Sequence, residues 1–131
     1  MVEFALLLPL LVFGLMGGAD LARAFAIQLA VQNAARAGAE AYAITSARTP
    51  SLAQQAAVEE MNRTPTVNAV PSNVAVTEGQ ADGSVCIHPP PPANPCFVTV
   101  TVIYSFQTIT AWPFVPNTAI FNRTTLFRMF Y

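Results

Sequence analysis

Charged side chains are scarce in this sequence of 131 residues. Only 10% of the residues are Asp, Glu, Lys or Arg, well under half of the ~25% typical of soluble globular domains. With 53% hydrophobic residues, the chain as a whole does not have the composition of a disordered protein. Its six basic residues are all arginines, widely spaced and balanced by seven acidic residues, so we expect no nucleic acid among its partners.

Residue types that carry catalysis are also few. His88 is the single histidine, there is no Gly-rich phosphate loop, and no nucleophile, base and orienting residue form a recognisable set. The two cysteines lack the C-x-x-C spacing of metal and redox sites. We therefore expect a protein that is not an enzyme, with no catalytic residues, no metal site and no cofactor.

Cys86 and Cys96 bracket a proline-rich segment that includes four consecutive prolines. Two cysteines that close a stiff loop of about ten residues predict a disulfide, worth roughly 2–4 kcal/mol. Disulfides persist in oxidising compartments, so this pair favours an extracytoplasmic location. The alternative is a pair of free, buried thiols.

The longest uncharged run lies near the N-terminus. Residues 4–19 carry no charge, and as a helix they would span about 24 Å, less than the ~30 Å hydrocarbon core of a bilayer. Asp20 and Arg23 follow, three residues apart and therefore on one helix face. Because either charge would cost about 2.5–3.5 kcal/mol at mid-bilayer, we expect both near the outer interface or in contact with other protein. They form either an intrahelical pair or an ion pair between subunits.

Residues 19–47 contain twelve alanines, the best helix former, and no proline. We predict one helix from about residue 3 to residue 48, roughly 69 Å long and kinked or locally unravelled at Pro9. The first of three expected parts is thus 1–48, a stem for the membrane or a filament core. The second, 49–65, is a linker and a short helix over 52–62 with Ser51 as its N-cap.

The third part, 66–131, has a β pattern and is expected to be surface-exposed. Residues 96–106 alternate, and their apolar members share one face: Val98, Val100, Val102, Tyr104 and Phe106. Another strand is expected around 74–76, with turn residues over 78–83, and a last strand over 120–131. The predicted fold class is α+β: a long N-terminal hydrophobic α-helix, pilin-like in shape, with a small antiparallel β-sheet packed on its distal half.

The first part of the chain also contains three motifs in a characteristic order. They are Val2-Glu-Phe-Ala-Leu-Leu-Leu-Pro-Leu-Leu11, Gly17-Gly-Ala-Asp-Leu-Ala-Arg23 and Val31-Gln-Asn-Ala-Ala-Arg-Ala-Gly38. Together they closely resemble the TadE-like family, the pseudopilins of tight-adherence (Flp-type) pilus systems, which are related to type IV pilins. The resemblance covers residues 2–39.

This resemblance implies the life history of a prepilin. A prepilin peptidase cuts a short basic leader, the chain stays in the inner membrane until assembly, and the pilus assembly machinery adds its helix to a filament. No leader precedes the motif, so we expect either that it has been removed or that the sequence begins inside the precursor. Glu3 is the third residue here, whereas the family's Glu is usually fifth after the cut, so the start of the mature chain stays open.

The resemblance further implies an assembly role for the N-terminal residues. Glu3 would pair with the free α-amine of a neighbouring subunit, because a carboxylate facing hydrocarbon is costly unless it is paired. Alternatively, it is only a helix-start acid, stabilised by about 0.3–1 kcal/mol. The G-x-x-x-G spacing of Gly14 and Gly18 lets helices approach closely. The candidate subunit-interface residues are Glu3, Phe4, Pro9, Gly14, Gly18, Asp20 and Arg23.

The leading hypothesis is a structural pilin-like subunit that self-associates through its N-terminal helix into a helical homopolymer, an extracellular type IV or Tad-like pilus filament on the cell surface. One alternative is a minor TadE-like pseudopilin that stays membrane-anchored and assists assembly or secretion. Another is an adhesin-like module with the loop 86–96 as its tip. Arg23, Arg36 and Arg48 follow the apolar run and by the positive-inside rule favour a cytoplasmic C-terminus. The predicted disulfide favours the outside, and we give it more weight.

Overall fold

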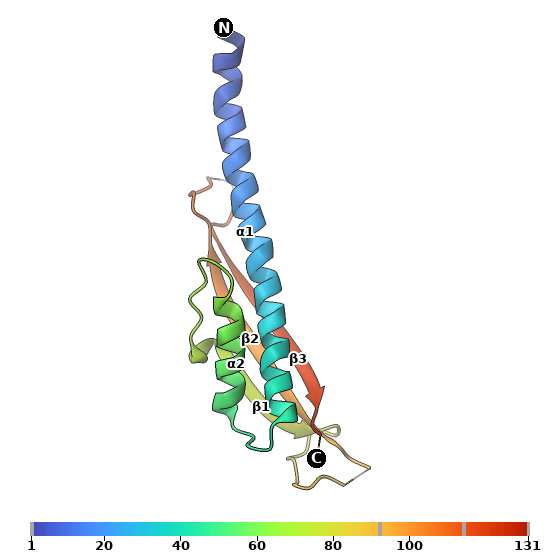
Figure 1. Ribbon diagram of the computed structural model, residues 1–131. Coiled ribbons are helices and arrows are strands. Elements are labelled where there is room, and N and C mark those ends of the chain that lie inside the picture. Colours follow the sequence, from blue (N-terminus) through green and yellow to red (C-terminus); the bar gives the residue numbers. More distant parts are fainter. Residues whose placement is uncertain (1, 92, 114, 131) are drawn as a thin grey trace.

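A computed structural model of the chain describes residues 2–91, 93–113 and 115–130. Its elements are α1 (Val2–Ile44), α2 (Pro50–Asn62), a 3₁₀ helix η1 (Pro71–Asn73), β1 (Val74–Gln80), β2 (Cys96–Gln107) and β3 (Thr118–Arg128). Figure 1 shows the N-terminal part of α1 projecting alone, with α2 and the sheet alongside its C-terminal half. The predicted α+β class, a long helix with a small antiparallel sheet on its distal half, is confirmed.

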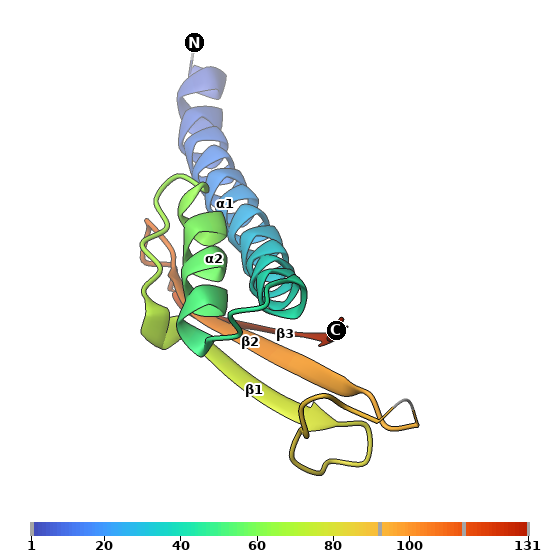
Figure 2. The same ribbon diagram turned by 60° about the horizontal axis from the view of Figure 1, so that its bottom comes forward.

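The three strands form one antiparallel sheet in the order β1-β2-β3. Figure 2 shows this sheet as a layer against the two helices. The central strand β2 alternates between buried and more exposed residues, because one of its faces meets the helices and the other faces solvent. The predicted inward face is confirmed, with three fully buried valines followed by two aromatics that are partly or nearly buried: Val98, Val100, Val102, Tyr104 and Phe106.

The two outer strands differ from their predicted limits. β1 continues through Glu78 and Gly79 to Gln80, because these residues pair with the start of β2, so the turn is shorter than the predicted 78–83. β3 begins two residues before the predicted strand, since Thr118 pairs with the last residue of β2. It ends at Arg128, so the predicted strand was wrong at Met129 and Phe130, and position 131 lies outside the described residues.

Small residues on α1 let α2 approach closely. The tightest point is Gly38, where an added Cβ would lie 2.8 Å from the carbonyl oxygen of Ala53 and 3.1 Å from the Cβ of Ala57. It would also lie 3.3 Å from Val100 Cγ1, so α1, α2 and the sheet all meet at Gly38. The alanine-rich half of α1 is therefore packed into the core of its own chain.

Helix α1 differs from the prediction at its end and near its start. It ends at Ile44 instead of residue 48, and just beyond it the Thr45 hydroxyl donates a 2.7 Å hydrogen bond to the carbonyl of Ala41. It also continues through Pro9 without unravelling.

The predicted N-cap of α2 was wrong by two residues. The helix begins at Pro50, and Thr49, not Ser51, stands at the N-cap in an extended conformation. Proline is favoured at the first helical position because the amide it lacks would have no partner there, and its fixed φ already suits a helix.

Candidate functional site

The N-terminal part of α1, residues 3–19 and here called the stem, has almost no cover from its own chain (Figure 1). Ten large apolar side chains are exposed on it: Phe4, Leu6, Leu7, Leu8, Leu10, Leu11, Val12, Phe13, Leu15 and Met16. By length and composition α1 could cross a membrane, and only 6% of its most apolar window is buried. A helix that is apolar all round and unburied needs lipid or other protein around it.

Five of the candidate assembly residues lie on this stem, and the first three are Glu3, Phe4 and Pro9. Glu3 is exposed in the first turn of α1 and makes no ion pair with another residue in the described part of the chain. Phe4 and Pro9 are exposed as well. The structure therefore leaves all three free for contacts outside this subunit.

Asp20 marks the point where the stem enters the folded part. The residue is only 5% exposed, although it lies within an apolar helix. It accepts hydrogen bonds from the amides of Ile109 (2.9 Å) and Thr110 (3.4 Å) and from Trp112 Nε1 (3.2 Å), all in the loop between β2 and β3. Sequence reasoning missed these partners, and the signal for them was an isolated carboxylate in an apolar run, which needs donors. Asp20 thus fastens the loop 108–117 to the base of the stem.

Arg23 lies one turn below Asp20 and is only partly satisfied. Its Nη1 is 3.3 Å from Asp20 Oδ1, and its guanidinium carbon is 5.5 Å from the centre of the Phe106 ring. Its Nε is buried and has no hydrogen-bond acceptor within the described part of the chain, while 30% of the side chain is exposed. The structure thus contains the intrahelical pair, and the exposed 30% of the Arg23 side chain is the part that an acceptor outside the chain can reach.

The glycines of the stem divide it into a covered side and an open side. An added Cβ at Gly17 would touch the Trp112 ring at 3.5 Å, whereas at Gly14 and Gly18 it would meet nothing within 4 Å. Toward the C-terminus, this open side continues through three exposed apolar residues of α1: Leu21 (59%), Phe25 (59%) and Leu29 (60%). The G-x-x-x-G face therefore continues alongside the folded part of the chain.

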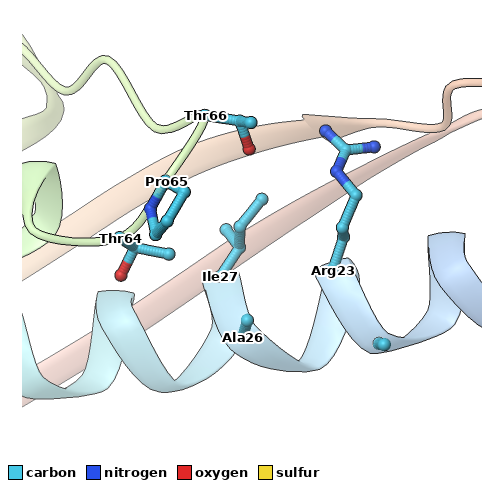
Figure 3. Close-up of a pocket in the computed structure, with 7 residues that line it drawn as sticks. Arg23, Ala26, Ile27, Thr64, Pro65 and Thr66 are labelled. Carbon is cyan, nitrogen blue, oxygen red and sulfur yellow. The ribbon is translucent and has the colours of Figure 1, made fainter.

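Among the grooves in the described part of the chain, two lie along α1 at the base of the stem. The first, about 390 Å³, lies between α1 and the loop 108–117 and includes Leu21 and Trp112 in its lining. The second, about 320 Å³, has Ala22 and Ala26 on α1 and residues 64–66 as its walls. Figure 3 shows Ile27 and Arg23 of α1 pointing toward residues 64–66 in this second groove.

The opposite end of the molecule carries the proline-rich loop, in which Cys86 and Cys96 form a disulfide. Asn94 Nδ2 donates to Gln80 Oε1 (2.7 Å) and to Asp82 Oδ2 (2.9 Å), which ties the loop to the end of β1. Hydrogen bonds from the side chain and amide of Ser84, and from Asn94, hold the pKa of Asp82 below its usual range. Within residues 2–91, 93–113 and 115–130, no group of three or more His, Cys, Asp or Glu side chains is placed to hold a metal ion.

Comparison with known protein families finds a match at the N-terminal end of the chain. The model of the family described as TadE-like protein matches residues 1–40, nearly the same segment as the three motifs, which confirms the resemblance. No curated protein and no solved structure matches the chain. The first forty residues are therefore similar to TadE-like proteins, and the exposed apolar helix that they open is long and apolar enough to cross a membrane.

Proposed function

We propose that this chain, whose first forty residues are TadE-like, is a structural subunit that polymerises through its stem into an extracellular pilus filament. Before assembly the stem is inserted in the cytoplasmic membrane, and the β-rich part lies outside. The observation that supports this most is the stem itself, which carries ten exposed large apolar side chains. In a filament, the stems of other subunits would provide the surroundings that lipid provides in the membrane.

The driving force for such assembly cannot be the hydrophobic effect alone. Lipid tails are as apolar as leucine, so moving the stem from lipid to a bundle of stems gains nothing from apolar burial by itself. Close packing and charge pairing must supply the difference. Gly14 and Gly18 offer an open face on which a second helix can approach closely, and Glu3 is a charge that needs a partner in an apolar environment.

The disulfide supports an outside location for the β-rich part. Cys86 and Cys96 are bonded in a loop at the end of the molecule far from the stem, and such bonds persist in oxidising compartments (Figure 1). The filament would then carry the sheet and the proline-rich loop on its surface, around a core of stems.

The proposal is tested on the open glycine face. Replacing both Gly14 and Gly18 with isoleucine keeps the stem apolar but blocks close approach, so we expect at least about tenfold fewer filaments in sheared preparations. The matched control is Val12→Ile, which lies on the opposite side of the helix and should leave filament number unchanged. Immunoblots of the membrane fraction would verify equal insertion of all three proteins. Wild-type filament numbers for the double glycine variant would contradict the proposal.

A minor pseudopilin would give a different result in the same experiment. In that case filaments would form from another protein, and this chain would remain in the membrane fraction of wild-type cells. The amount of chain in the sheared filaments therefore separates the bulk subunit from the assembly factor.

A further inference from the structure

Ionisable residues are so few along the upper part of α1 that their pairing can be worked out. From residue 2 to residue 35 there are only three: Glu3, Asp20 and Arg23. Asp20 is satisfied within its own chain by two backbone amides, the Trp112 indole and Arg23. Glu3 stands exposed on the stem, away from any described cation. In a bundle of stems Glu3 is the charge that still requires a partner.

Arg23 has the features of that partner. Its guanidinium makes one long contact with Asp20, and its buried Nε has no acceptor within the described residues. It stands at the wall of the second groove, whose other α1 residues include Ala22 and Ala26 (Figure 3). Because these alanines are small, another helix can come close enough for a carboxylate to reach the guanidinium. An arginine–carboxylate bond is also stronger than one between neutral groups.

We infer that this groove receives the first turn of the stem of a second copy of the chain, whose Glu3 pairs with Arg23. This inference rests on the proposed function and adds the contact that sets the axial register. A carboxylate on an apolar helix matches a partly exposed cation beside an apolar groove, and both are supplied by the same chain.

The pairing fixes the stagger between two parallel subunits. Glu3 and Arg23 are twenty residues apart, which on a helix corresponds to about 30 Å. With this offset the apolar residues that follow Glu3 in one copy lie beside the exposed Phe25 and Leu29 of the other. The next cation, Arg36, would need an offset of about 50 Å. It would set the stem against the polar residues Gln32 and Asn33.

Charge reversal tests the pair. Glu3→Arg and Arg23→Glu should each lower the filament yield by about tenfold or more, because each places two like charges together. The double variant Glu3→Arg with Arg23→Glu exchanges the charges and should restore the yield to within about threefold of wild type. Two other partners for these residues predict different outcomes. If Glu3→Arg abolishes filaments while Arg23→Glu has no effect, Glu3 pairs with an α-amine and the inference fails. If Arg23→Glu weakens membrane retention while Glu3→Arg has no effect, Arg23 binds a lipid phosphate and the inference fails.

A cross-linking experiment keeps both charges in place and does not depend on how Arg23→Glu folds. Phe4→Cys with Ala26→Cys should give disulfide-linked dimers and longer ladders on non-reducing gels of whole cells. Phe4→Cys with Arg36→Cys, ten residues further along α1, should not, and neither should the single variants.

The two experiments separate this inference from the proposed function. Filaments that form normally without the Phe4–Ala26 cross-link would overturn the inference and leave the proposed function standing. The cross-link in membranes of cells that make no filaments of this chain would support the contact and contradict the proposed function.

Discussion

Replacing Gly38 with alanine tests the packing of α1 against α2. The added Cβ would lie 2.8 Å from the backbone oxygen of Ala53, so relief requires α2 to move as a whole and not a single side chain. Overpacking of this kind costs about 1–3 kcal/mol, while the change from glycine to alanine in a helix returns about 1 kcal/mol. Since the closest contact is with backbone, we expect the upper part of the range, a net loss of about 1–2 kcal/mol.

The matched control is the same substitution at Gly18, which is also inside α1 but has nothing within 4 Å of the added Cβ. Gly18→Ala should therefore leave stability unchanged or raise it slightly through helix propensity. Thermal unfolding of the full chain in detergent, followed by circular dichroism, measures both variants under one condition. A melting temperature for Gly38→Ala equal to or above that of Gly18→Ala would refute the packing argument.

Three further variants test the attachment of the loop 108–117 to Asp20, the disulfide, and the acid response of the proline-rich loop. Asp20→Ala removes the acceptor for the loop 108–117, so the emission maximum of Trp112, the single tryptophan, should lie at a longer wavelength than in wild type. An emission maximum equal to that of wild type would contradict the role of Asp20 in holding the loop. Cys96→Ser opens the disulfide and should lower the free energy of unfolding by about 2–4 kcal/mol, and equal denaturation midpoints for the variant and wild type would argue against this. Because the folded pKa of Asp82 is lowered, its contribution to loop stability is present above the ordinary carboxyl pKa and is lost as pH falls through the lowered value. The protection factor of the Ser84 amide, which is the exchange rate of an unstructured amide at the same pH divided by that of Ser84, should therefore fall on acidification in wild type but not in Asp82→Asn, and the same acid response in both proteins would disprove the role of this carboxylate.

The fold could be predicted where the sequence repeats with the period of one element. The alternation of residues 96–106 predicts the inward face of β2, because side chains on a strand alternate between faces regardless of what they pack against. The uncharged run and the alanine-rich run predict α1 as a single helix for a different reason, because alanine is the best helix former and no proline interrupts residues 19–47. The N-cap of α2 was misplaced because Thr49 and Ser51 are both good capping residues, and the choice between them depends on the proline that separates them.

The site was harder to predict because its contacts join distant parts of the chain. Asp20 is bound by a loop almost ninety residues further on, and no local pattern links the two. Gly38 is needed for packing because an added Cβ would lie 2.8 Å from the carbonyl oxygen of Ala53. This closeness depends on how α2 packs on α1 and leaves no local pattern in the sequence. Glu3, Gly14 and Gly18 stay predicted assembly residues, and the stem around them has little tertiary structure of its own that would cover them.

As proposed above, this chain is the bulk protein subunit of a pilus filament. The most direct measurement is the composition of filaments sheared from the cells, with electron microscopy to verify the filaments and quantitative mass spectrometry to identify their bulk protein. We expect this chain to be the main component, present in a constant amount per length of filament. Filaments that lack the chain or hold only traces of it, with the protein retained in the membrane fraction, would contradict the account.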